Sequence, residues 1–170
     1  MRSWWWQRSR QAVRHVVARV RPAELAALGR WLSPAQLALF RTMPRADQRH
    51  GLDVVSALAA AGYDEPDLRL AGLLHDVAKG PTVRLWHRVA WSLGERYGPG
   101  VGDRLAALPG FAAPFDRLRH HAARSAELAL AAGCSPRVAA LIRAQAGPLD
   151  PASGVDPRLG EALRLADDAS

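Results

Sequence analysis

A chain of 170 residues with 49% hydrophobic and 23% charged side chains is able to bury a core of its own, which indicates one globular domain. Its single cysteine, Cys134, excludes an intrachain disulfide and a zinc site built from several thiolates. No uncharged run approaches the ~18 residues that a membrane span needs, which argues against an integral membrane protein.

Charge is distributed unevenly along the chain. Residues 1–50 carry ten arginines and two acidic residues, whereas residues 51–170 carry thirteen basic and fourteen acidic residues. The net charge of +7 therefore belongs to the N-terminal part. An arginine-rich stretch is compatible with contact to nucleic acid, but a solvated or domain-packed face explains it as well, and we favour the latter.

The first twenty residues have the pattern of an amphipathic helix. Three consecutive tryptophans at positions 4–6 open a segment to Val20 in which valines recur at helical spacing. Such a helix is able to lie on an anionic membrane surface. We favour a helix that packs on the domain or is partly disordered, because the segment is short and has no second anchor. Arginines interrupt any apolar core of signal-peptide length, so the expected compartment is the cytoplasm.

Helix-start signals divide the rest of the chain. Ser33-Pro34, Ser135-Pro136 and Asp156-Pro157 each combine a capping side chain with a proline at the first helical position. Further helices are predicted at about residues 22–31, 44–61, 64–75, 82–97 and 114–132, whereas the glycines and prolines of residues 98–113 predict a broken, loop-rich connection. No segment alternates like a strand, so the predicted fold is all-α. We divide it into a basic, tryptophan-rich helical extension over residues 1–32 and a helical domain over residues 33–170.

The sequence is organised around residues 73–80, which read Leu-Leu-His-Asp-Val-Ala-Lys-Gly. The apolar run before them predicts a helix that carries His75 and Asp76 into the interior. A buried charged pair must be neutralised, hydrogen-bonded or bound to a metal. Lys79, the only lysine in the chain, follows this pair. A metal site and an internal His–Asp hydrogen bond with a helix-terminal lysine explain the segment equally well.

Other candidate ligands lie at the ends of predicted helices. His50 lies on an apolar helical face, and His120 and His121 open another helix. Asp167 and Asp168 close the last helix, where two carboxylates oppose the helix macrodipole and favour a compensating cation. A solvated chain end is the alternative explanation of these two aspartates.

The order of His50, His75-Asp76 and Asp167 on successive helices resembles the H…HD…D pattern of the HD-domain metal-dependent phosphohydrolase superfamily. The resemblance extends from about residue 40 to residue 170 and is strongest at residues 49–50, 73–80 and 166–167. It implies a bundle in which His50, His75, Asp76 and Asp167 bind one divalent cation. Two imidazoles and two carboxylates suit Mn²⁺, Fe²⁺, Ni²⁺, Co²⁺ or Mg²⁺ better than a structural zinc ion.

The same resemblance implies roles in catalysis. Asp76 would hold or accept a proton of the attacking water, and Lys79 would contact a phosphate oxygen. His121 matches the additional histidine of small members with an HD-x-x-K motif, and it would protonate the leaving group or hold a weaker second ion.

One departure from the two-metal members concerns Gln145, which stands where they carry a second downstream histidine. Glutamine is a poor metal ligand, so a single cation is expected. His121 and, more remotely, His120, Gln145 and Asp168 are candidates for the surroundings of the ligands or for a weak second metal site. His120 is expected to face a backbone group or solvent, and His15 and His87 are predicted to be ordinary exposed residues.

These residues predict a phosphohydrolase that acts on a nucleotide or a related small phosphate. The alternative is a non-catalytic HD module that binds a nucleotide or a metal and regulates a partner, and the missing histidine at position 145 favours this alternative. No motif indicates an oligomeric state.

Overall fold

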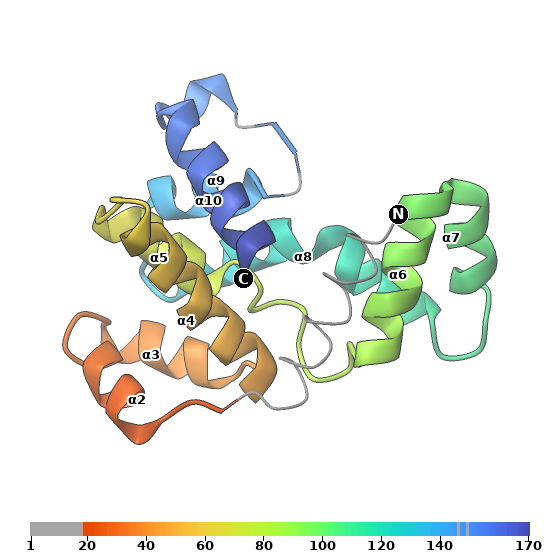
Figure 1. Cartoon of the computed structure of the whole chain (residues 1–170), viewed down its shortest axis with the longest axis horizontal. Helices are drawn as coiled ribbons and strands as arrows, with labels where there is room; N and C mark the ends of the chain where they lie inside the picture. The colour runs from red at the N-terminus through yellow and green to blue at the C-terminus, as the bar shows by residue number, and fades with distance from the viewer. Residues whose placement is uncertain (1–18, 146, 149) are drawn as a thin grey trace.

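The computed structural model describes residues 19–145, 147–148 and 150–170, and within these ranges it contains nine α-helices, one short 3-10 helix and no strand (Figure 1). The helices are α2 (Pro22–Leu28), α3 (Pro34–Arg41), α4 (Arg45–Ala60), α5 (Pro66–Leu74), α6 (Leu85–Tyr97), α7 (Pro99–Ala106), α8 (Ala112–Ala131), α9 (Pro136–Arg143), η1 (Pro151–Ser153) and α10 (Pro157–Ala169). The all-α prediction is confirmed. None of these helices is long and apolar enough to cross a lipid bilayer. The expected amphipathic helix over residues 4–20 falls, apart from its last two residues, outside the described ranges.

The predicted capping residues lie at helix starts. Ser33 Oγ accepts a hydrogen bond from the Gln36 N–H at 3.2 Å, and Gln36 Oε1 accepts one from the Ser33 N–H at 2.9 Å. Ser135 Oγ and Asp156 Oδ1 accept hydrogen bonds from first-turn N–H groups of α9 and α10 at 3.2 and 2.9 Å. These side chains satisfy amides that lack a partner within the helix, which explains why the three helices begin where the sequence predicts.

The core forms around α5, against which α4, α9 and α10 pack. Leu68, Leu73 and Leu74 of α5 are completely buried. Gly51 of α4 lies so close to α5 that a Cβ atom there would come within 2.7 Å of the Leu73 carbonyl oxygen. Only glycine permits this approach of the two helices, and the approach brings the residue before it, His50, to the buried end of α5.

Residues 98–113 differ from the predicted loop-rich connection, because half of them form α7. Pro99 occupies the first turn, where its missing N–H costs nothing, and Gly98 connects α6 to α7 with a φ of 99°. A Cβ atom on Gly94 of α6 would lie 2.9 Å from the Cα atom of Gly102. The glycines and the proline thus permit a tight helical hairpin at one end of the molecule (Figure 1).

His87 also differs from the prediction, since it is only 7% exposed. Its Nδ1 accepts a hydrogen bond from the Arg84 N–H at 3.1 Å, and its ring meets the edge of Phe111 at a centroid distance of 4.9 Å. The neighbouring arginines suggested a solvent-facing helix, but α6 turns its first residues toward the start of α8. The pattern in sequence gave no sign of this contact.

Candidate metal centre

The His-Asp pair lies at the buried end of α5. The helix ends at Leu74, His75 is its C-cap, and His75 and Asp76 are each 2% exposed. The turn that follows is fixed against α8, because the Ala78 N–H donates a hydrogen bond to the buried Ser125 hydroxyl at 3.1 Å. The sequence interpretation did not single out Ser125, which holds the backbone two residues after Asp76.

A backbone contact sets the orientation of the His75 ring. Its Nδ1 lies 2.9 Å from the Gly72 carbonyl oxygen, and because that oxygen only accepts, Nδ1 carries a proton. Nε2 therefore faces Asp76 Oδ1 and Asp167 Oδ1, each at 3.4 Å. Metal-binding histidines are commonly oriented by a hydrogen bond from the ring nitrogen that does not bind the metal.

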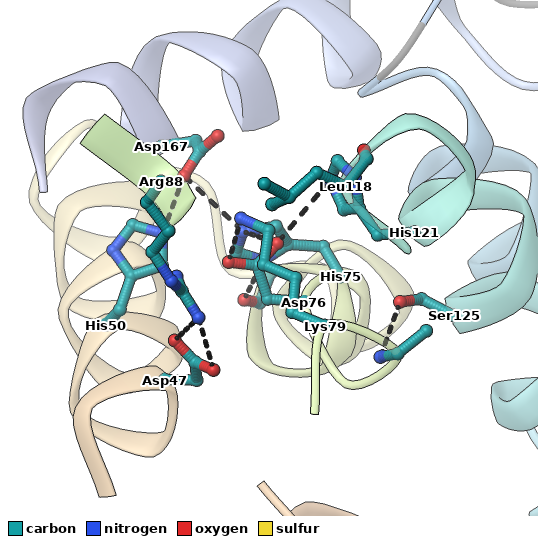
Figure 2. A network of polar contacts seen from close by, with 12 residues as sticks. Asp47, His50, His75, Asp76, Lys79, Arg88, Leu118, His121, Ser125 and Asp167 are labelled. Carbon is teal, nitrogen blue, oxygen red and sulfur yellow. Dashed lines mark hydrogen bonds and ion pairs between the residues drawn. The ribbon is translucent and has the colours of Figure 1, made fainter. Parts of the chain in front are cut away.

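Helices α4 and α10 contribute the other two predicted ligands. His50 Nε2 lies 2.7 Å from Asp167 Oδ1, and the His50 and His75 ring centroids are 5.2 Å apart. Figure 2 shows the side chains of His50, His75, Asp76 and Asp167 pointing toward one another from these helices and the end of α5. The structure thus brings together residues that are up to 117 positions apart in the sequence.

The donor atoms of three of these residues lie close enough together to share one cation. Suitable atoms of His50, His75 and Asp76 lie within 4.8 Å of one another. Buried His75 Nε2 and Asp76 Oδ1 make no hydrogen bond within the described residues. Adjacent donors around an octahedral ion with bonds of ~2.1 Å are ~3.0 Å apart, and the separations of 2.7 and 3.4 Å at this site bracket that value. A divalent cation therefore fits these residues and would satisfy both unpartnered atoms.

The charged side chains of the site shift one another's pKa values. Burial opposes the charged form of His75, but the carboxylates of Asp76 and Asp167 outweigh it and raise the pKa of His75 to about 9. Burial would raise the pKa of Asp76, yet His75 and Lys79 hold that pKa well below its usual value. Partial burial opposes the charged form of Asp167, yet this residue also has a lowered pKa, chiefly because of His75 and His50. Both carboxylates are therefore ionised at neutral pH and attract positive charge.

Lys79 lies within this network. Its Nζ is 2.6 Å from Asp76 Oδ2, and its side chain is 17% exposed. The family resemblance gave Lys79 a contact with phosphate, and the structure adds a contact with a predicted ligand. Asp76 thus has one oxygen bonded to Lys79 and the other, Oδ1, turned toward His75 and His121.

His121 lines the same site from α8. Its Nδ1 lies 2.6 Å from the Leu118 carbonyl oxygen, and its Nε2 lies 3.7 Å from Asp76 Oδ1. Burial and, to a lesser extent, the nearby Lys79 lower the pKa of His121. The ring is therefore neutral at pH 7, with its proton on Nδ1 and a lone pair on Nε2.

Two of the remaining candidates, His120 and Asp168, are exposed and pair with residues other than the four ligands. His120 is half exposed, in agreement with the expected solvent-facing ring, and its Nδ1 lies 2.9 Å from Asp116 Oδ1. Asp168 is 68% exposed and pairs with Arg164 at 3.3 Å, because the helix turns it away from the side that Asp167 occupies. Neither His120 nor Asp168 supports the ligands. Gln145 Nε2 is buried and has no hydrogen-bond partner in the described part of the chain.

An ion pair that the sequence interpretation missed borders His50. Asp47, one turn earlier on α4, is 1% exposed, and both of its carboxylate oxygens lie 2.8 Å from Arg88 Nη2 of α6 (Figure 2). The spacing of three residues between Asp47 and His50 was the available signal, since such residues share a helix face. For Arg88 there was no such signal in the sequence, because its position depends on how α6 packs.

No family model, curated protein or solved structure matches this chain. What supports a function is therefore the convergence of four side chains and the sequence pattern that they form.

Proposed function

We propose that this chain is a metal-dependent phosphohydrolase of the HD-domain type that cleaves a phosphoester of a nucleotide or a related small phosphate, in the cytoplasm. The observation that carries the proposal is the convergence of His50, His75, Asp76 and Asp167. Two of the converging atoms, His75 Nε2 and Asp76 Oδ1, are buried and lack a partner among the described residues. Nitrogen and oxygen donors without sulfur suit Mn²⁺, Fe²⁺, Ni²⁺, Co²⁺ or Mg²⁺.

Each ligand has a distinct place in the proposed site. His75 and Asp76 would hold the ion from the buried side, whereas His50 and Asp167, with side chains 26% and 32% exposed, would hold it from the solvent side. When bound, such a cation lowers the pKa of a coordinated water toward ~7 and offsets negative charge on phosphoryl oxygens. The partly exposed side is the one from which substrate would enter.

Two further residues would take part in the reaction. His121, neutral and with its lone pair on Nε2, is suited to accept a proton from the attacking water and to return it to the leaving group. The resemblance implies that His121 protonates the leaving group. We extend this role to accepting a proton first, because the Leu118 carbonyl oxygen fixes the ring proton on Nδ1 and leaves the lone pair on Nε2. Lys79 keeps Asp76 ionised and offers a positive charge to a phosphate oxygen at the partly exposed side.

The direct test is a screen of nucleotides and small phosphoesters with protein purified without chelator. We expect hydrolysis of at least one phosphoester, loss of hydrolysis with chelator, and recovery on addition of one of the five candidate cations. Metal-loaded protein that hydrolyses none of them would contradict the proposal.

A second candidate is a non-catalytic module that binds a nucleotide or a metal and regulates a partner. The observation that favours it is Gln145, whose buried amide nitrogen has no described partner in the region where the resemblance leads one to expect a histidine. Metal-dependent binding of a nucleotide without its hydrolysis would support this second candidate.

A further inference from the structure

Arg88 reaches the edge of the candidate metal centre from a separate part of the fold. Its helix, α6, belongs to the hairpin at one end of the molecule (Figure 1), yet its guanidinium contacts Asp47 of α4. Asp47 and His50 are three residues apart on one helix, so their side chains are neighbours. Figure 2 shows the guanidinium bonded to Asp47 and drawn together with the residues of the candidate metal centre.

The ion pair between Asp47 and Arg88 costs desolvation free energy to form. The Asp47 side chain is 2% exposed and the Arg88 side chain 21% exposed, so both groups have lost most of their hydration. A buried ion pair seldom stabilises a protein more than apolar residues of the same size would. A role of Arg88 in binding a ligand therefore explains the ion pair better than a contribution to stability does.

Arg88 has hydrogen-bond donors to spare. Both oxygens of Asp47 are bonded to Nη2 alone. Among the described residues, buried Nε has no partner and none accepts a hydrogen bond from Nη1. An arginine held at one nitrogen by a carboxylate is fixed in place, and its Nη1 stays available for an anion.

Other cations near the ligands are less suited to this task. Arg49, next to His50, is bonded to Glu24 at 2.6 Å and to Asp53 at 2.9 Å. Lys79 is bonded to Asp76 at 2.6 Å. Arg117 lies near Gly80, but its side chain is exposed and no described contact fixes it. Arg88 is thus a cation beside the site that is both anchored and incompletely bonded.

We infer that Arg88 binds a phosphate oxygen of the ligand and that Asp47 positions it for this contact. The inference rests on the proposed function, since it assigns the phosphate group of that site's ligand to a particular side chain. It makes Arg88 the residue through which the site selects a phosphorylated compound over an uncharged one. Asp47 acts only through Arg88.

Binding of inorganic phosphate to the full chain, measured by titration calorimetry with and without Mn²⁺, tests this inference. Arg88→Gln alone leaves Asp47 buried and unpaired, which threatens folding. The double variant Asp47→Asn/Arg88→Gln removes both charges and keeps a polar amide side chain at each position. The matched control is Asp116→Asn/Arg124→Gln, which removes the exposed pair on α8 whose atoms are 2.9 Å apart.

We expect the double variant at positions 47 and 88 to bind phosphate about ten- to a hundredfold more weakly, because charge-assisted hydrogen bonds are lost. Arg88→Lys should fall between it and the wild type, since a lysine keeps the charge but not the planar fork. Affinity for Mn²⁺ should change in neither variant, and the control should match the wild type in both measurements.

A folded double variant with the phosphate affinity and KM of the wild type would overturn the inference, even if its melting temperature fell. A wild type that binds no phosphate would overturn it as well. If the wild type binds phosphate through Arg88 but hydrolyses no phosphoester, the proposed hydrolysis fails and the inference stands. If it hydrolyses a phosphoester and the double variant keeps the wild-type KM, the inference fails and the proposed function stands.

Discussion

Two groups of side chains in this molecule contain both histidine and aspartate but lie in opposite surroundings. The central group, His50, His75, Asp76 and Asp167, joins α4, the end of α5 and α10, and its His75 and Asp76 are 2% exposed. The surface group, Asp116, His120 and Arg124, lies on α8 alone, and its side chains are 45–51% exposed. In the surface group every pair is an ordinary ion pair at 2.9 Å.

The difference lies in which atoms have partners. Water is able to satisfy any atom of the surface group, and such an exposed pair contributes at most ~1 kcal/mol to stability. In the central group Nε2 of His75 and Oδ1 of Asp76 are buried and have no partner in the part of the chain that the structure describes, a state that costs free energy unless a ligand relieves it. Burial, rather than residue type, therefore separates a candidate metal site from a surface network.

The largest effect should come from removing a ligand. We expect Asp76→Ala to lower affinity for the cation by more than ~100-fold and to abolish hydrolysis, since the variant loses a carboxylate that would bind the ion. Asp116→Ala, the matching change in the surface group, should leave both unchanged. Metal analysis and a phosphoesterase assay on the two variants measure this contrast, and equal metal content in both would contradict it.

A smaller effect is expected at Lys79. Lys79→Ala should retain the cation, because removing a positive charge 2.6 Å from Asp76 leaves that carboxylate free to bind it. Turnover should fall roughly ten- to a thousandfold, since a charge-assisted contact with the phosphate is lost in the transition state. Arg124→Ala is the control. Loss of the cation in Lys79→Ala would mean that the lysine holds Asp76 in position rather than the phosphate.

Local signals in the sequence account for much of the fold. Ser33, Ser135 and Asp156 place helix starts correctly because capping depends on residues three or fewer positions away. Pro99 misled the prediction, since a proline is equally at home in a loop and in the first turn of a helix. The close approach of Gly94 to Gly102 favours the helix over the loop, and this contact cannot be predicted from the sequence.

In the candidate site, too, some residues were predictable from the sequence and others depend on how the helices pack. Asp76 and Asp167 were predicted as ligands from a family pattern, and the structure places Oδ1 of each 3.4 Å from His75 Nε2. Arg88 escaped prediction because nothing in its own helix relates it to Asp47, 41 residues earlier. The bond between Lys79 and Asp76 follows from the turn after α5, whose path the sequence does not state.

The pH dependence of stability should also distinguish the two groups. In protein freed of metal, the pKa of His75 is raised from about 6.5 to about 9, so the folded state binds a proton more tightly than the unfolded chain. This stabilisation is complete below about pH 6.5 and is lost as the pH rises through about 9. Urea unfolding between pH 6 and pH 10 should show the loss in metal-free protein and in its His120→Gln variant alike. A metal-free His75→Gln variant that shows the same loss would contradict this origin.

The smallest effect concerns the packing behind the central group. Gly51→Ala should lower the free energy of unfolding by ~1–3 kcal/mol, because its Cβ atom would come within 2.7 Å of the Leu73 carbonyl oxygen. Gly160→Ala on α10 is the control, since its Cβ atom would meet Ala144 at an ordinary 3.7 Å. That change should be neutral or stabilise by up to ~1 kcal/mol. Urea denaturation measures both, and equal effects would contradict the close approach of α4 and α5.

The central claim is that the buried group, and not the surface group, holds one cation. Anomalous diffraction from crystals grown with Mn²⁺ locates the ion directly. We expect one peak per chain among His50, His75, Asp76 and Asp167, with donor atoms about 2.0–2.3 Å from it. A peak at Asp116 and His120 alone, or fully ordered ligands with no peak between them at saturating Mn²⁺, would contradict the claim.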